Sequence, residues 1–156
     1  MIASLKLLTV TFVVTAIYDI ILRLISEERV PMFDFIKGAP WMRSLKEYFE
    51  RTTPLQAALV AGFVGAVTQF FIVLIRAPPA RFELITTLSF LWISFVVSGL
   101  SGELMRASKL FPVLDDTMYH PKNLTRIQSI LADASSGVVV NATLLFMIQV
   151  MKLAIV

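Results

Sequence analysis

The chain has 156 residues, of which 57% are hydrophobic and only 16% charged, and its mean hydropathy is +0.80. This inverts the balance of a soluble domain and predicts one compact membrane bundle instead of two domains. The lack of cysteine excludes disulfides, thiolate metal sites and a cysteine nucleophile, and the net charge of +3 includes no dense basic run typical of nucleic-acid binding.

Four apolar segments are long enough to cross a bilayer, and they predict a single transmembrane domain over residues 1–156. The segments cover about 5–25, 55–75, 82–104 and 124–153. A hydrocarbon core about 30 Å thick requires about 20 helical residues. None of the segments has the alternation or the ~10-residue length of a barrel strand. The predicted fold is therefore all-α, a polytopic bundle of four transmembrane helices.

The first segment resembles a signal peptide, because one lysine, Lys6, precedes a long apolar run. The run is longer than the apolar region of such peptides, and no small-x-small cleavage site follows it, so we expect an uncleaved first span. Near its end, Asp19 and Arg23 stand four residues apart on one helix face. A carboxylate and a guanidinium group at that spacing can pair and lower each other's desolvation cost.

The first loop contains an amphipathic stretch at about residues 41–51. At helical spacing, Trp41, Leu45, Tyr48 and Phe49 share one face, with charged residues on the others. This pattern predicts a short helix lying at the membrane interface, anchored by those four side chains.

The two following boundaries are marked by proline. Thr53 and Pro54 provide an N-cap and a first helical residue for the second span. Pro78 and Pro79 predict a tight, extended turn, which makes the second and third spans adjacent and antiparallel.

An even number of spans places both termini and the connection at 76–81 on one side of the membrane. Loops 26–54 and 105–123 then lie on the other side. The positive charges near the membrane favour the cytoplasm for the two long loops. Ten lie on the long-loop side and four on the opposite side: Arg23, Arg29, Lys37, Arg43, Lys46, Arg51, Arg106, Lys109, Lys122 and Arg126 against Lys6, Arg76, Arg81 and Lys152.

Charged groups within spans are expensive, so each is a functional candidate. Besides Asp19 and Arg23, these are Glu103, Arg106 and Asp133, and all five lie toward the long loops. One interpretation is an ion or proton site made of the three carboxylates, with arginines as gates. The other is a set of polar clamps between helices near the headgroups, which we favour because none of the five is clearly at the midplane.

Small residues recur at four-residue spacing in three spans, a pattern that lets helix backbones approach closely. We favour a tightly packed bundle as the interpretation, and a substrate-lined groove is the alternative. In the same way, we interpret Gln69 and Gln149 as links between helices in preference to ligands for a substrate. The residues are Gly62 and Ala66 in the second span, Ser94, Ser98 and Gly102 in the third, and Asp133, Gly137 and Asn141 in the fourth.

Carboxylates and the lone histidine meet only in the second long loop, at Asp115, Asp116 and His120. These groups could form a metal or acid–base site, but an aspartate-capped turn closed by His120 and Pro121 is the simpler interpretation. The chain contains no hydrolase, zinc-protease, phosphate-loop or dinucleotide motif. We therefore expect no catalytic residues, no metal, no cofactor and no enzymatic activity.

The chain resembles small four-span proteins encoded by large DNA viruses of algae and protists. The resemblance lies in two short stretches, residues 15–23 at the end of the first span and 131–140 at the start of the fourth. The resemblance implies a minor capsid component in the inner membrane of a virion. It also implies capsid proteins as partners, and it carries no catalytic residues over.

The functional expectation is a non-enzymatic structural or assembly protein, which engages lipid headgroups and neighbouring proteins of a larger assembly through its loops. The alternative is a small transporter, channel or ion-coupled subunit that uses the intramembrane carboxylates. A lipid-modifying enzyme acting through the second loop ranks last.

Overall fold

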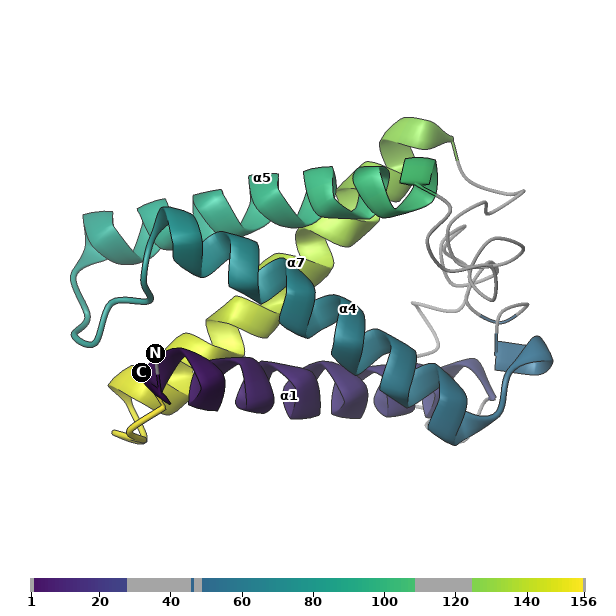
Figure 1. Ribbon diagram of the computed structural model, residues 1–156, viewed down its shortest axis with the longest axis horizontal. Coiled ribbons are helices and arrows are strands. Elements are labelled where there is room, and N and C mark those ends of the chain that lie inside the picture. Colours follow the sequence, from purple (N-terminus) through teal and green to yellow (C-terminus); the bar gives the residue numbers. More distant parts are fainter. Residues whose placement is uncertain (1, 28–45, 47–48, 109–124, 156) are drawn as a thin grey trace.

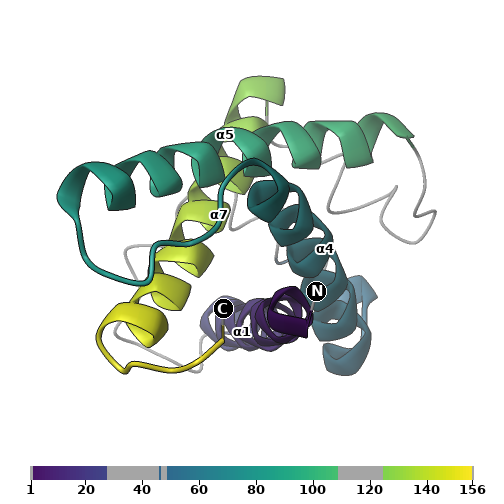
Figure 2. The same ribbon diagram turned by 60° about the vertical axis from the view of Figure 1, so that its left-hand side comes forward.

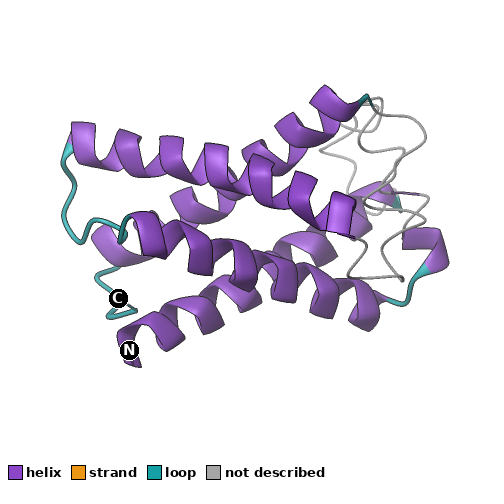
Figure 3. Cartoon of the chain, turned by 45° about the horizontal axis from the view of Figure 1, so that its top comes forward, coloured by secondary structure: helices purple, strands orange, loops and turns teal. Residues whose placement is uncertain are grey.

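The computed structural model describes residues 2–27, 46, 49–108 and 125–155. The described chain is all-helical, with no strand in these residues, which confirms the predicted fold class (Figure 3). Its four long helices are α1 (Ile2–Ser26), α4 (Pro54–Ile75), α5 (Leu84–Ser108) and α7 (Arg126–Gln149).

Each helix holds a stretch long and apolar enough to cross a bilayer, at Leu5–Ser26, Pro54–Ile75, Leu84–Met105 and Arg126–Gln149. At 1.5 Å per residue, the 22 residues of α4 extend for about 33 Å, the thickness of a hydrocarbon core. Large apolar side chains on the outer faces are exposed, as at Trp92 with 65%. Lipid solvates such a surface, so the chain is an integral, multi-pass membrane protein.

The starts of α4 and α7 are fixed by side-chain caps. Thr53 Oγ1 accepts a hydrogen bond from Gln56 N at 3.2 Å, and Pro54 takes the first helical position, as predicted. At α7 the capping box is reciprocal: Gln128 N donates to Thr125 Oγ1, and Thr125 N donates to Gln128 Oε1. These bonds satisfy backbone groups that would otherwise be unpaired near the membrane surface.

The fourth span ends earlier than predicted, at Gln149 instead of residue 153. The chain then reverses through Lys152, whose φ of 56° is left-handed, and Ile155 packs back against Leu7, Val140 and Leu144. The mostly apolar run beyond Gln149, which Lys152 interrupts, is therefore a hook that covers the core and is not a continuation of the helix.

The helices form two antiparallel pairs (Figures 1 and 2). The most extensive contacts are those of α1 with α4 and of α5 with α7, which we call the first and second pairs. Between the pairs, α4 contacts α5 and α1 contacts α7 over smaller areas. The second and third spans are thus antiparallel neighbours near their short connection, as Pro78 and Pro79 predicted, but neither is the other's main partner.

The two ends of the bundle differ. Both termini and the connection between α4 and α5 lie at one end, which we call the terminus end, and the helix ends that lead into the two long loops lie at the other, the loop end (Figure 1). Apolar contacts between the two pairs concentrate toward the terminus end, where Ile72 of α4, Phe90 of α5 and Leu145 of α7 form one cluster. The pairs are joined there by an apolar core.

Candidate functional site

The small residues of the second pair lie where α5 and α7 touch. A Cβ at Gly137 would overlap the hydroxyl of Ser98, and a Cβ at Gly102 would lie 2.6 Å from Asp133 Cγ. Gly99 is less constrained, because a Cβ there would be 3.2 Å from Ile130 Cγ2. Polar side chains of each helix therefore rest directly on the glycine backbone of the other.

The first pair is built in the same way. A Cβ at Gly62 would lie 2.9 Å from the Phe12 ring, and one at Gly65 would lie 2.8 Å from Thr15 Cβ. Ala66 is half-buried on the neighbouring turn. Close approach of two helices increases their dispersion contacts, which is a principal source of helix association in lipid.

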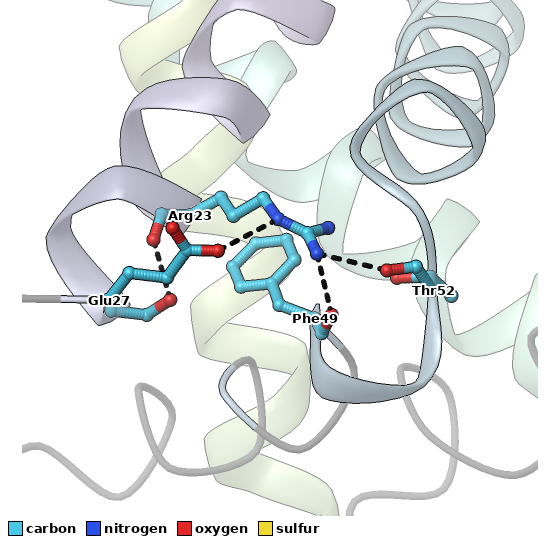
Figure 4. Close-up of polar contacts among 5 residues, drawn as sticks. Arg23, Glu27, Phe49 and Thr52 are labelled. Carbon is cyan, nitrogen blue, oxygen red and sulfur yellow. Dashed lines mark hydrogen bonds and ion pairs between the residues drawn. The ribbon is translucent and has the colours of Figure 1, made fainter.

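Arg23 does not pair with Asp19, the partner that its spacing suggested. Its Nε contacts Glu27 Oε1 at 3.2 Å, and its Nη2 donates to the carbonyl oxygens of Phe49 at 2.8 Å and Thr52 at 3.0 Å (Figure 4). The guanidinium carbon also lies 5.5 Å from the centre of the Phe49 ring. Arg23 therefore fastens the end of α1 to the segment that leads into α4.

Asp19 is buried with an exposure of 6%, and its Oδ2 has no hydrogen-bond partner in the part of the chain that the structure describes. The proposed Asp19–Arg23 pair fails because the two carbonyl oxygens and Glu27 draw the guanidinium group toward the loop end. Asp19 is thus the carboxylate of the first pair that faces the interior.

The carboxylates of the second pair lie elsewhere. Glu103 of α5 pairs with Arg126 Nε, at the first residue of α7. Asp133 lies against Gly102, and Asn141 Nδ2 donates to the Gly137 carbonyl oxygen at 3.0 Å. The side chain of Arg106, also predicted in this polar cluster, lies outside the described residues. Of the predicted residues whose side chains the structure describes, Asp19 and Arg23 lie in the first pair and Glu103, Asp133 and Asn141 lie in the second.

Phe49 was predicted to face the lipid interface, and the structure contradicts this. Its side chain is 3% exposed and packs with Ala57, Leu22 and Met105. Lys46 and residues 49–51 are helical, so a short helix does precede α4. The other three predicted anchors, Trp41, Leu45 and Tyr48, lie outside the described residues, as do Asp115, Asp116 and His120.

The deepest side chains of the bundle form two layers, one apolar and one polar. Among the described side chains larger than alanine, those less than 2% exposed are one apolar and one polar residue from every helix. The apolar layer is Leu7, Ile72, Phe90 and Leu144, and the polar layer is Thr11, Gln69, Ser94 and Asn141. In each helix the polar residue lies three or four positions toward the loop end from the apolar one. Sequence analysis missed Thr11, because a single threonine in an apolar run is compatible with any helix face.

Other polar contacts connect the helices. Tyr18 and Thr143 share a hydrogen bond between α1 and α7, and Gln149 Nε2 donates to the carbonyl oxygen of Pro79 in the α4–α5 connection at 3.0 Å. Within the described residues, no three histidine or acidic side chains come together as a metal site. The arrangement supplies hydrogen bonds and ion pairs across helices.

The fold and these contacts define a class, the multi-pass α-helical membrane proteins with polar links between tightly packed spans. The comparisons with known proteins add no relative: no family model matches the sequence, and no curated protein or solved structure is significantly similar to it.

Proposed function

We propose that this protein is a non-enzymatic structural or assembly protein that holds a neighbouring protein layer at a bilayer. The observation that supports this best is the contact set of Arg23. A cation at the membrane boundary is used to fix the two ends of the first long loop to each other, through Glu27 on one side and Phe49 and Thr52 on the other.

A loop whose two ends are attached in this way is suited to bind a neighbouring protein. A loop held at both ends loses less conformational entropy when a partner binds than a free loop does. Next to the Arg23 contacts, a cavity of about 480 Å³ offers side chains of both charges to a partner. It is lined by Arg23, Ser26, Glu27, Lys46, Phe49 and Glu50. The Glu103–Arg126 pair likewise connects the two sides of the second long loop, through a more exposed contact.

The resemblance to viral four-span proteins supplies a setting for the proposal. In that setting the bilayer is the inner membrane of a virion, and the protein layer is a capsid in which this chain acts as a minor component.

The test is photo-cross-linking in the native assembly. A photoreactive amino acid at Lys46 or Glu50, both exposed, should yield adducts with one or a few neighbouring proteins. The matched control is Leu100 on the outer face of α5, with 60% exposure, which should yield lipid adducts. Lipid adducts alone from all three positions would contradict an assembly role.

A second candidate, a small transporter or ion-coupled subunit, is favoured by one observation, the buried and unpartnered Oδ2 of Asp19. Of the other two carboxylates that this reading requires, Glu103 is engaged with Arg126 and Asp133 is packed against Gly102. Ion flux that is lost in both Asp19→Asn and Asp133→Asn would select this candidate over the first.

A further inference from the structure

The polar layer is in register across both helix pairs. One turn from the Thr15–Gly65 contact toward the terminus end, Thr11 comes opposite Gln69. One turn from the Ser98–Gly137 contact in the same direction, Ser94 comes opposite Asn141. Each pair thus brings one hydroxyl and one amide side chain to the same level of the bundle, and one more turn leads to the apolar layer.

This level lies well inside the membrane. Counted from the terminus end of each helix, the four polar residues are six to ten residues deep, which corresponds to roughly 9 to 15 Å. Ordinary interfacial hydration therefore does not explain them. A polar side chain at such a depth needs a partner inside the protein.

Several polar atoms of this interior lack a protein partner. In the described part of the chain, Gln69 Nε2 is a donor without an acceptor and Asn141 Oδ1 an acceptor without a donor, and both side chains are 1% exposed. One turn nearer the loop end, Ser98 Oγ is also unpartnered, and further along lies Asp19 Oδ2. Unpaired donors and acceptors in one buried region are most simply satisfied by water, which both donates and accepts.

The distribution of these atoms is one-sided. On the loop side of the polar layer, the unpartnered buried atoms in the described part of the chain are Ser98 Oγ, Asp19 Oδ2 and Arg23 Nη1. Toward the terminus end the apolar layer closes the interior, and the next unpartnered atom, Thr87 Oγ1, lies beyond it in the first turn of α5. We propose that the bundle contains an internal water site that reaches from Asp19 to the polar layer and is closed by Leu7, Ile72, Phe90 and Leu144.

This inference does not depend on the structural role proposed above. A scaffold with a hydrated interior transports nothing as long as the apolar layer stays closed. The ligand class is water, since the polar layer itself carries no formal charge to attract an ion.

The test uses the lack of cysteine in the chain. Single-cysteine variants Ser98→Cys and Ser94→Cys change one atom each, and in proteoliposomes their reaction with silver ions reports water, because the thiolate forms only where water solvates it. Both should react at least about tenfold faster than Ile72→Cys and Leu144→Cys in the apolar layer. Lys46→Cys, which is exposed, gives the unrestricted rate.

Two results would overturn the proposal. If neither serine variant reacts while Lys46→Cys does, the interior is dry; if Ile72→Cys and Leu144→Cys react as fast as the serine variants, the apolar layer does not close it. A measurement on the unmodified protein guards against misfolded variants. The side-chain amide protons of Gln69 and Asn141 should show magnetisation transfer from water by NMR. Absence of this transfer would also overturn the proposed water site.

Discussion

Arg23 and Phe49 contact each other twice. The Arg23 Nη2 donates to the Phe49 carbonyl oxygen at 2.8 Å, and the guanidinium carbon lies 5.5 Å from the centre of the Phe49 ring. The same Nη2 also reaches the Thr52 carbonyl oxygen, so one side chain connects the end of the first span with the entry to the second. These contacts predict how substitutions of Arg23 and Phe49 change the stability of the fold.

Arg23→Ala should lower the free energy of unfolding by about 2–4 kcal/mol, because it removes charge-assisted bonds to two carbonyl oxygens that then lie unpaired. Arg23→Lys should restore part of this, since an ammonium group can reach one carbonyl oxygen but not both with the same geometry. Glu27→Gln is the matched control, with an expected loss of less than about 1 kcal/mol, because the variant keeps an acceptor for Arg23 Nε on a side chain that is 36% exposed. Thermal unfolding in detergent measures all three variants. A wild-type midpoint for Arg23→Ala would show that the Arg23 contacts contribute nothing to stability.

Phe49→Ala should destabilise the fold by about 3–5 kcal/mol, the usual cost of emptying a buried aromatic site. Phe49→Leu should cost less because it keeps the site partly filled. Were Phe49 a lipid anchor instead, Phe49→Ala would leave unfolding unchanged and only weaken membrane association of the loop. Denaturant titration of the two variants separates these cases.

Gly137→Ala should destabilise by about 1–3 kcal/mol despite the better helix propensity of alanine, because the new methyl group would occupy the position of the Ser98 hydroxyl. Gly99→Ala should cost less than Gly137→Ala, because its added methyl group would lie 3.2 Å from Ile130 Cγ2, 3.3 Å from Ala134 Cβ and 3.4 Å from the Ile130 carbonyl oxygen. Adding Ser98→Gly to Gly137→Ala should recover part of the loss. If the unfolding midpoint of the double variant is no higher than that of Gly137→Ala, the Ser98 hydroxyl is not the group that the new methyl group meets.

Lys152→Gly should be tolerated or slightly stabilising, by up to about 1 kcal/mol, because the left-handed φ of 56° suits glycine better than any other residue. Lys152→Val should loosen the hook and expose the contact between Ile155 and Leu7. Protease digestion from the C-terminus provides the readout, and equal protection of the two variants would contradict the left-handed turn.

The sequence alone predicts the four spans, the start of α4 at Thr53 and Pro54, and the small-residue positions, because each depends on local composition or spacing. It does not predict the partner of Arg23. The choice between Asp19, Glu27 and a backbone carbonyl depends on where Phe49 lies, and this is a tertiary contact. The apolar face of the segment at 41–51 could not distinguish lipid from protein as its neighbour, since both are apolar.

Two further features of the structure could not be predicted from the sequence, because they also depend on tertiary contacts. The end of α7 carries no glycine or proline signal, and the residues after Gln149 are again mostly apolar, so the sequence does not mark the helix end there. The polar layer appears only once the register of the two helix pairs is known, because Thr11 and Gln69 are far apart in the sequence and neither span shows which residue of the other lies opposite.

We propose that charged groups such as Arg23, Glu103 and Arg126 fasten the helices of this bundle and that the bundle carries no ions. The most direct measurement is ion and proton flux into liposomes containing the purified protein under an applied potential and pH gradient. The account predicts flux no greater than that of empty liposomes, for the wild type and for Asp19→Asn alike. Robust flux in the wild type that disappears in Asp19→Asn would contradict it.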